Sequence, residues 1–159
     1  MKRCVITGVV SAAVSAVLVC VLFAAAENYD EKYNANYLEA FYGSEVYGEL
    51  DIPCKIGDLK EILPVLELAE EAFSHIGGDE RFGKLGRYCV REDAVSEKHT
   101  LGFITAALDG ESGYMWVMYS QSCFDENGET LSGAGSVTSR WELKKINGVW
   151  TVTDIWEHP

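Results

Sequence analysis

The residues with the clearest potential for chemistry lie near the C-terminus, where tryptophans and a carboxylate recur at even spacing. Asn147-Gly148 is typical of a two-residue β-hairpin turn, and it would pair Ile146 with Val149. Continued without interruption, that register places on one face the pairs Lys145 with Trp150, Leu143 with Val152, Trp141 with Asp154 and Ser139 with Trp156. The predicted ligand-binding residues on this face are Trp141, Trp150, Asp154 and Trp156.

This predicted surface combines aromatic rings with a single carboxylate. Such a surface suits an apolar ligand that carries a cationic or hydrogen-bonding group, and it predicts a noncatalytic binding module. Core packing of the tryptophans beneath a helix is an open alternative. A second alternative is a pocket enzyme in which Asp154, together with His99, forms an acid–base pair. Burial raises the pKa of a carboxyl group toward neutrality, which would make Asp154 a usable general base. Spacing alone assigns no catalytic residue.

The other residues that could hold a metal ion or act as nucleophiles are scattered. His75, His99 and His158 lack the i, i+4 spacing of a helical metal site, so we expect no metal and no cofactor. Three of the five cysteines, Cys54, Cys89 and Cys123, follow residue 26, and no pair of them has CxxC spacing. In an oxidising compartment three cysteines allow one disulfide and one free thiol, or three thiols, and the spacing does not choose.

An apolar segment at the N-terminus predicts where these residues operate. Met1-Lys2-Arg3 precedes a run without charged residues from Cys4 to Ala26. As a helix this run would cover roughly 34 Å, enough to span the hydrocarbon core of a bilayer. Basic residues before the run and acidic residues after it place residues 27–159 outside the cytoplasm.

Two fates of the leader stay open. Ala24-Ala25-Ala26 supplies the small residues of a signal-peptide cleavage site, which predicts a secreted domain. The apolar run is long for a cleaved signal, which favours a single-span anchor and a membrane-tethered ectodomain acting through a membrane partner. Lipid modification of Cys20 is a third option, disfavoured by Val19 before it and by the apolar residues after it.

The charge of the exported part limits its partners. All 25 acidic residues and 11 of the 13 Lys and Arg residues follow Ala26, which gives that part a formal net charge of −14. This acidity disfavours nucleic acid and anionic lipid headgroups, so contact with the membrane is expected only through residues 4–26. We expect a small molecule, a peptide or another protein as partner.

The chain divides into a leader (1–26), an aromatic helix with a connecting segment (27–57) and one α+β domain (58–159). Aromatic residues recur every fourth position along residues 28–42, which predicts an amphipathic helix. The connection over residues 43–57 is predicted to hold a short strand near 49–52. Asp58, followed by Glu61, is spaced as an N-terminal cap for a second helix that Gly77-Gly78 would end.

From residue 84 onward the apolar pattern changes to a period of two. It predicts strands over residues 85–91, 99–108, 113–122, 135–146 and 149–157, joined as an antiparallel meander. The second face of the last hairpin, with Arg140, Glu142 and Lys144, is expected to meet solvent. The predicted fold is a helix packed against a curved, cone-like antiparallel sheet, preceded by the N-terminal apolar helix.

A helix followed by a long meander that ends in Trp141-Glu142-Leu143-Lys144-Lys145-Ile146-Asn147-Gly148-Val149-Trp150-Thr151-Val152-Thr153-Asp154-Ile155 resembles the nuclear-transport-factor-2-like, or cystatin-like, superfamily. The likeness is one of pattern and covers roughly residues 58–157. It implies a sheet wrapped around a helix to form a conical pocket, in a superfamily that holds dehydratases, isomerases, accessory domains and exported proteins. The Gln-x-Val-x-Gly loop of inhibitory cystatins is missing, and the resemblance transfers no functional residue.

Overall fold

The computed structural model describes residues 44–157, so the expected apolar helix of residues 4–26 and the aromatic helix of residues 28–42 lie outside the described part. The helical elements are α3 (Ser44–Tyr47), η1 (Gly48–Asp51), α4 (Ile56–Ser74) and η2 (Glu80–Tyr88). The strands are β1 (Ser96–Asp109), β2 (Ser112–Phe124), β3 (Thr130–Ile146) and β4 (Val149–Glu157). Within residues 44–157, no helix is both long enough and apolar enough to cross a bilayer.

The four strands form one antiparallel sheet in the order β1-β2-β3-β4, which confirms the predicted meander. Each of the last four predicted strands is present, and three of them are longer than expected. The strand predicted over residues 85–91 is wrong, because η2 occupies most of that stretch. Its buried residues Leu85 and Tyr88, both after the kink at Gly83, are three positions apart, the period of a 3₁₀-helix.

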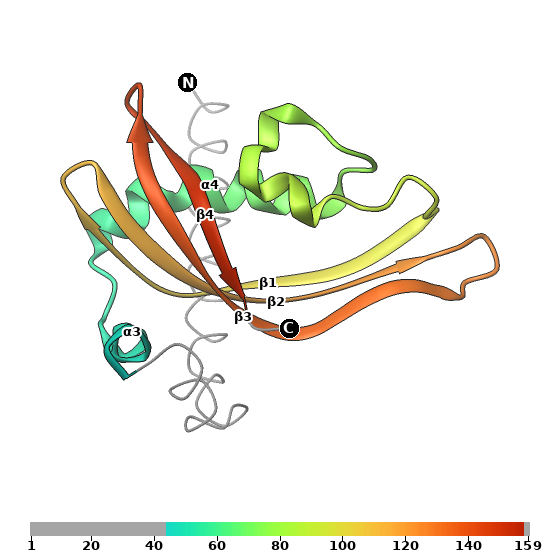
Figure 1. Ribbon diagram of the computed structural model, residues 1–159, viewed down its shortest axis with the longest axis horizontal. Helices are drawn as coiled ribbons and strands as arrows, with labels where there is room; N and C mark the ends of the chain where they lie inside the picture. The colour runs from blue at the N-terminus through green and yellow to red at the C-terminus, as the bar shows by residue number, and fades with distance from the viewer. Residues whose placement is uncertain (1–43, 158–159) are drawn as a thin grey trace, which may run out of the picture.

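Helix α4 lies across one face of the sheet, and the sheet curves toward it (Figure 1). The helix meets the sheet through an apolar face formed by Leu59, Ile62, Val65, Leu66, Ala69, Ala72 and Phe73. The sheet contributes Phe103, Met115, Val117, Trp141, Leu143 and Val152 to the same core. The α+β architecture, a helix packed against an antiparallel sheet, is therefore as predicted.

The start of α4 differs from the predicted cap. The helix begins at Ile56, and Lys55 at its N-cap position makes no side-chain capping bond. Asp58 instead accepts a hydrogen bond from the backbone N–H of Leu108, at 3.3 Å. Glu61 accepts from Trp150 Nε1 at 2.7 Å. Both carboxylates that were expected to cap the helix therefore tie it to the sheet.

The segment before α4 lies on the opposite side of the sheet, where Figure 1 shows α3. The short strand expected near residues 49–52 is wrong, since residues 48–51 form η1. Thr105 Oγ1 donates a short hydrogen bond to the carbonyl oxygen of Ile52, and Thr105 is buried. This anchors the segment to β1.

The last hairpin follows the predicted register for only half its length. Ile146 pairs with Val149, and the next pairs continue as predicted up to Leu143 with Val152. The register then shifts by one, because Glu142 pairs with Asp154 and leaves Thr153 as an extra residue in β4. A one-residue shift turns every later side chain to the other face. The prediction that Asp154 and Trp156 share a face with Trp141 and Trp150 is therefore wrong.

Candidate functional site

Two of the four predicted ligand-binding residues belong to the core. Trp141 is 0% exposed and Trp150 8% exposed, both on the face covered by α4. Trp150 gives its N–H to Glu61 on α4, and Lys145 Nζ lies 3.0 Å from the same carboxylate. These tryptophans support the fold, as the core-packing alternative expects.

A buried polar network surrounds Trp141. Its Nε1 lies 2.8 Å from Ser139 Oγ and 3.0 Å from the Tyr88 hydroxyl oxygen. The Tyr88 hydroxyl in turn donates to Glu157 Oε1 at 2.5 Å. Burial, reinforced by the charge of Glu157, raises the pKa of Tyr88, so this hydroxyl stays protonated. Each polar group in the network has a partner from the protein itself.

The other two predicted residues face away from α4. Trp156 is 50% exposed and pairs across the strands with Arg140, while Asp154 is exposed and pairs with Glu142. Asp154 Oδ1 accepts from the backbone N–H of Ile155 at 3.0 Å. The exposed ring and the exposed carboxylate are two residues apart on one strand and share its outward face. We call Asp154, Trp156 and Glu142 the outward patch.

Beside the outward patch, Arg140 links η1 to the sheet. Its guanidinium donates to both carboxylate oxygens of Glu49, at 2.6 and 2.9 Å, and makes a short contact with Glu142. Trp116 Nε1 donates to Glu49 as well, at 3.0 Å. Only 11% of the Arg140 side chain is exposed, so the expectation that this residue meets solvent is wrong.

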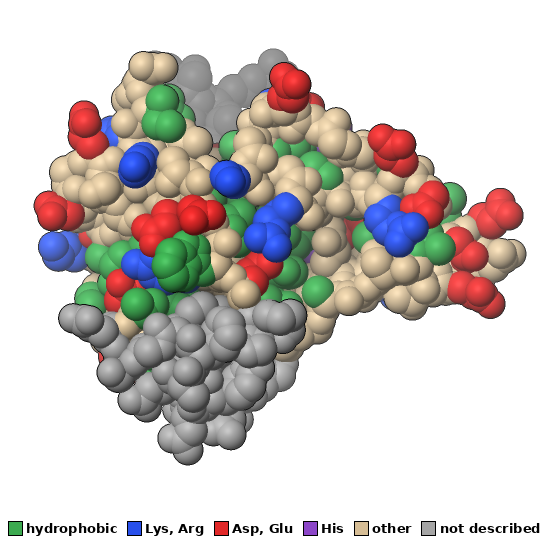
Figure 2. All heavy atoms as spheres, in the orientation of Figure 1, with side chains coloured by type: hydrophobic (Ala, Val, Ile, Leu, Met, Phe, Trp, Pro, Cys, Tyr) green, Lys and Arg blue, Asp and Glu red, His purple; other side chains and the backbone are tan. Residues whose placement is uncertain are grey.

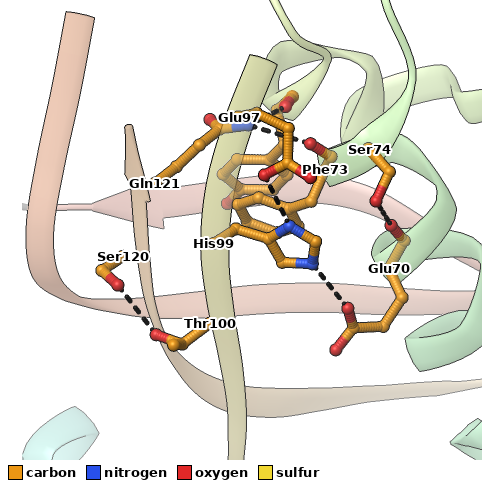
Figure 3. Close-up of polar contacts among 9 residues, drawn as sticks. Glu70, Phe73, Ser74, Glu97, His99, Thr100, Ser120 and Gln121 are labelled. Carbon is orange, nitrogen blue, oxygen red and sulfur yellow. Dashed lines mark hydrogen bonds and ion pairs between the residues drawn. The ribbon is translucent and has the colours of Figure 1, made fainter. Parts of the chain in front are cut away.

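A third polar cluster lies where the C-terminal part of α4 meets β1. His99 lies between two carboxylates, with Nε2 at 2.8 Å from Glu70 and Nδ1 at 2.9 Å from Glu97 (Figure 3). Its ring stacks on Phe73 with centroids 5.3 Å apart, and Phe73 stacks on Tyr88 at 4.6 Å. Gln121 Nε2 donates to the backbone oxygens of Phe73 and Tyr88 and so connects β2 to α4 and η2.

The predicted acid–base pair is not assembled. His99 lies on β1 and Asp154 on β4, the two opposite edges of the sheet. Asp154 is exposed and therefore lacks the buried surroundings that this hypothesis requires. Among the described residues, no group of three or more His, Cys, Asp or Glu side chains is arranged to hold a metal ion.

The cysteines in the described part carry free thiols. Cys123 is buried, while Cys54 and Cys89 are partly buried. Burial raises the pKa of both Cys54 and Cys89, which keeps them as thiols and disfavours a nucleophilic role.

The pairings within these clusters carry no signal in the sequence. Glu70 and His99 are 29 positions apart, and Tyr88 and Glu157 are 69 apart. Only the packing of α4 and η2 on the sheet brings them together.

No family model matches this chain, and no curated protein sequence matches it either.

Proposed function

We propose that this chain is an exported, noncatalytic binding module whose partner contacts the outward patch. The single observation that carries the proposal is the exposed Trp156 beside the exposed Asp154. A large aromatic side chain that is half exposed is uncommon in a protein whose other described tryptophans are all buried. Tryptophan is also among the residues that contribute most to binding at interfaces.

The chemistry of the patch favours a partner with a cationic group. The face of an indole ring attracts ammonium and guanidinium groups, and a neighbouring carboxylate strengthens that attraction. Asp154 supplies an exposed carboxylate two residues before Trp156 on β4, and Glu142, whose carboxylate also contacts Arg140, lies on the neighbouring strand β3. The formal net charge of −12 for the whole chain adds a long-range attraction for basic partners. We infer a peptide or protein segment that presents lysine or arginine.

Export is the second part of the proposal, and it is supported by the sequence of residues 1–26. In this proposal the domain operates outside the cytoplasm, either secreted after cleavage or held by residues 4–26 as a tethered ectodomain. The meander with α4 on one face supports membership of the nuclear-transport-factor-2-like or cystatin-like superfamily. An acid–base pair of Asp154 and His99 does not support the enzyme alternative, because the two residues lie on opposite edges of the sheet.

The test is a titration of the protein with a short peptide rich in lysine and arginine, followed by isothermal titration calorimetry, which reports the affinity of wild type and of variants that lack Trp156. We expect Trp156→Ala to weaken binding roughly 3- to 30-fold, the range for a cation–π contact. Asp154→Asn should weaken it less. The fold should be retained in both variants, as measured by circular dichroism.

The control is Val149→Ala, an exposed apolar residue at the other end of β4. It should leave the affinity unchanged, and a matched peptide rich in glutamate should not bind. Equal affinity of wild type and Trp156→Ala for the cationic peptide would refute the outward patch as the binding surface.

A further inference from the structure

We propose that His99 is a pH-responsive latch that holds the C-terminal part of α4 against the start of β1. The latch consists of His99, Glu70 and Glu97. Glu70 lies on α4, while Glu97 and His99 lie two residues apart on the same face of β1 (Figure 3). This inference does not depend on the outward patch, because β1 and β4 are opposite edges of the sheet.

The hydrogen bonds of the latch require a protonated imidazole. A neutral imidazole has one N–H donor and one acceptor nitrogen, whereas an ionised carboxylate only accepts. Both ring nitrogens of His99 lie within 2.9 Å of a carboxylate oxygen. Both contacts are therefore hydrogen bonds only when His99 carries two ring protons and a positive charge. Loss of one proton would leave a lone pair facing a carboxylate and break one contact.

The groups around His99 make its protonation state matter mainly for its contacts with Glu70 and Glu97. In the described part of the chain, the ion pairs of Glu70 and Glu97 are both with His99. The neighbouring α4 residue Glu71 pairs with Arg81 at 3.1 Å. From β2, the residue opposite His99 is the neutral Gln121. From η2, the neutral Tyr88 lies behind Phe73 in the aromatic stack.

The direction of the pH response follows from the geometry. Burial disfavours the charged ring, but the hydrogen bonds and charges of Glu70 and Glu97 outweigh it and raise the pKa of His99. Because this pKa is higher in the folded than in the unfolded chain, the latch contributes fully to stability below about pH 6.5, the ordinary histidine value. That contribution is lost as the pH rises through the raised folded value.

Loss of the contacts between His99 and the two carboxylates does not expose the hydrophobic core. Phe73 is fully buried and belongs to the core, so the aromatic stack persists when an ionic contact breaks. The side chain of Glu70 is 51% exposed, so its carboxylate can turn into water. Loosening is therefore expected in the last turns of α4 and the first residues of β1, at the edge of the sheet.

The test follows the titration of each histidine by NMR in the full chain, with His99→Gln used to assign the His99 signals. We expect the His99 pKa to lie above 6.5, and Glu70→Gln and Glu97→Gln each to lower it. The control is Glu71→Gln, which removes a carboxylate from the next position of α4 but not from the latch. It should leave the His99 titration nearly unchanged.

A second readout separates the latch from simple packing. The difference in unfolding equilibrium between wild type and His99→Gln is measured in urea at pH 5.5 and pH 9. We expect it to shrink at the higher pH by roughly 1.5- to 5-fold per contact, the range for partly exposed ion pairs. A His99 pKa at or below 6.5, no response to Glu70→Gln, or an equal effect of His99→Gln at both pH values would each overturn the proposal.

Discussion

At the scale of single residues, the polar atoms inside the fold bind one another. Trp141, Ser139, Tyr88 and Glu157 form a continuous chain of hydrogen bonds under η2. Arg87 extends it to the surface, with Nη2 at 3.1 Å from Glu157. Such a network adds specificity to a core only while every member is satisfied. The hydroxyl of Tyr88 is its central member, because it contacts Trp141, Ser139 and Glu157.

Tyr88→Phe should therefore destabilise the domain. The substitution keeps the aromatic stack but leaves the largely buried Glu157 carboxylate without its tyrosine donor. Loss of one partner of a buried hydrogen bond costs about 1–3 kcal/mol. The measurement is the free energy of unfolding in urea. Tyr114→Phe is the control, because the ring of Tyr114 contacts Arg140 on the other face of the sheet.

The same scale explains which residues could be predicted from the sequence. Trp141 and Trp150 were expected on one face of the sheet, as ligand-binding residues or, in the alternative, packed beneath a helix; they share that face and belong to the core under α4. Glu61 was expected to cap α4 and instead binds Trp150, because a carboxylate on a helix start can serve either partner. Local spacing predicts the capping role of Glu61. It carries no information about Trp150, which is 89 positions away in the sequence.

At the scale of elements, one extra residue in β4 decides what the C-terminal hairpin presents. The Asn147-Gly148 turn adopts positive φ at both residues, as a two-residue hairpin turn requires, and it sets the first four pairs correctly. The bulge at Thr153 then reverses the faces. A bulge has no signature in the alternation of apolar residues, so the turn and its neighbouring pairs were predictable but the outward direction of Trp156 was not.

Deletion of Thr153 should restore the uninterrupted register and turn Asp154 toward the core. Burial of an unpaired carboxylate costs roughly 2 kcal/mol or more, so the midpoint of urea unfolding should fall markedly. Thr151→Ala, at a half-buried position of the same strand, serves as a control for loss of a threonine side chain. A deletion variant as stable as wild type would contradict the assigned role of the bulge.

The element η2 shows a second limit of periodicity. Gly83 has φ +53°, a backbone conformation that interrupts the helix. Residues 85–91 contain apolar side chains at spacings that fit a short strand as well as a 3₁₀ turn. The packing of Leu85 and Tyr88 on the α4 core selects the turn.

At the scale of the whole molecule, the surface carries many acidic side chains, and the two faces of the sheet are covered by different elements. Acidic side chains gather at the right-hand end of the molecule in Figure 2, where the β2–β3 turn carries Asp125, Glu126 and Glu129. One sheet face is closed by α4 and η2, and the other holds η1, Arg140 and the outward patch. A basic partner would therefore be attracted over a long range and bound locally.

Because that attraction acts through exposed charges, binding of the cationic peptide should weaken as salt is added. The screening length falls from about 10 Å at 0.1 M to about 3 Å at 1 M salt, which suppresses the long-range component first. The association rate should decrease more than the dissociation rate increases, as measured by stopped-flow fluorescence. Salt-independent association would show that the net charge plays no part in binding.

Export is tested on the same scale by determining the N-terminal residue and the cell fraction of the protein in a secreting host. A mature start at Glu27 in the soluble extracytoplasmic fraction is expected for a cleaved leader. An intact Met1 in the membrane fraction is expected for a tether. Recovery of the full chain as a cytoplasmic protein would contradict export.

The ion pair between Glu49 and Arg140 has a mechanical consequence. It joins the segment that precedes α4 to an inner strand of the sheet, across 91 positions of sequence. A pulling force applied through the chain before Ser44 would reach β3 through this ion pair before it reached α4. The hydrogen bonds between the strands would then resist the force. Helix α4 would stay packed on the core, because the force would not act on it directly.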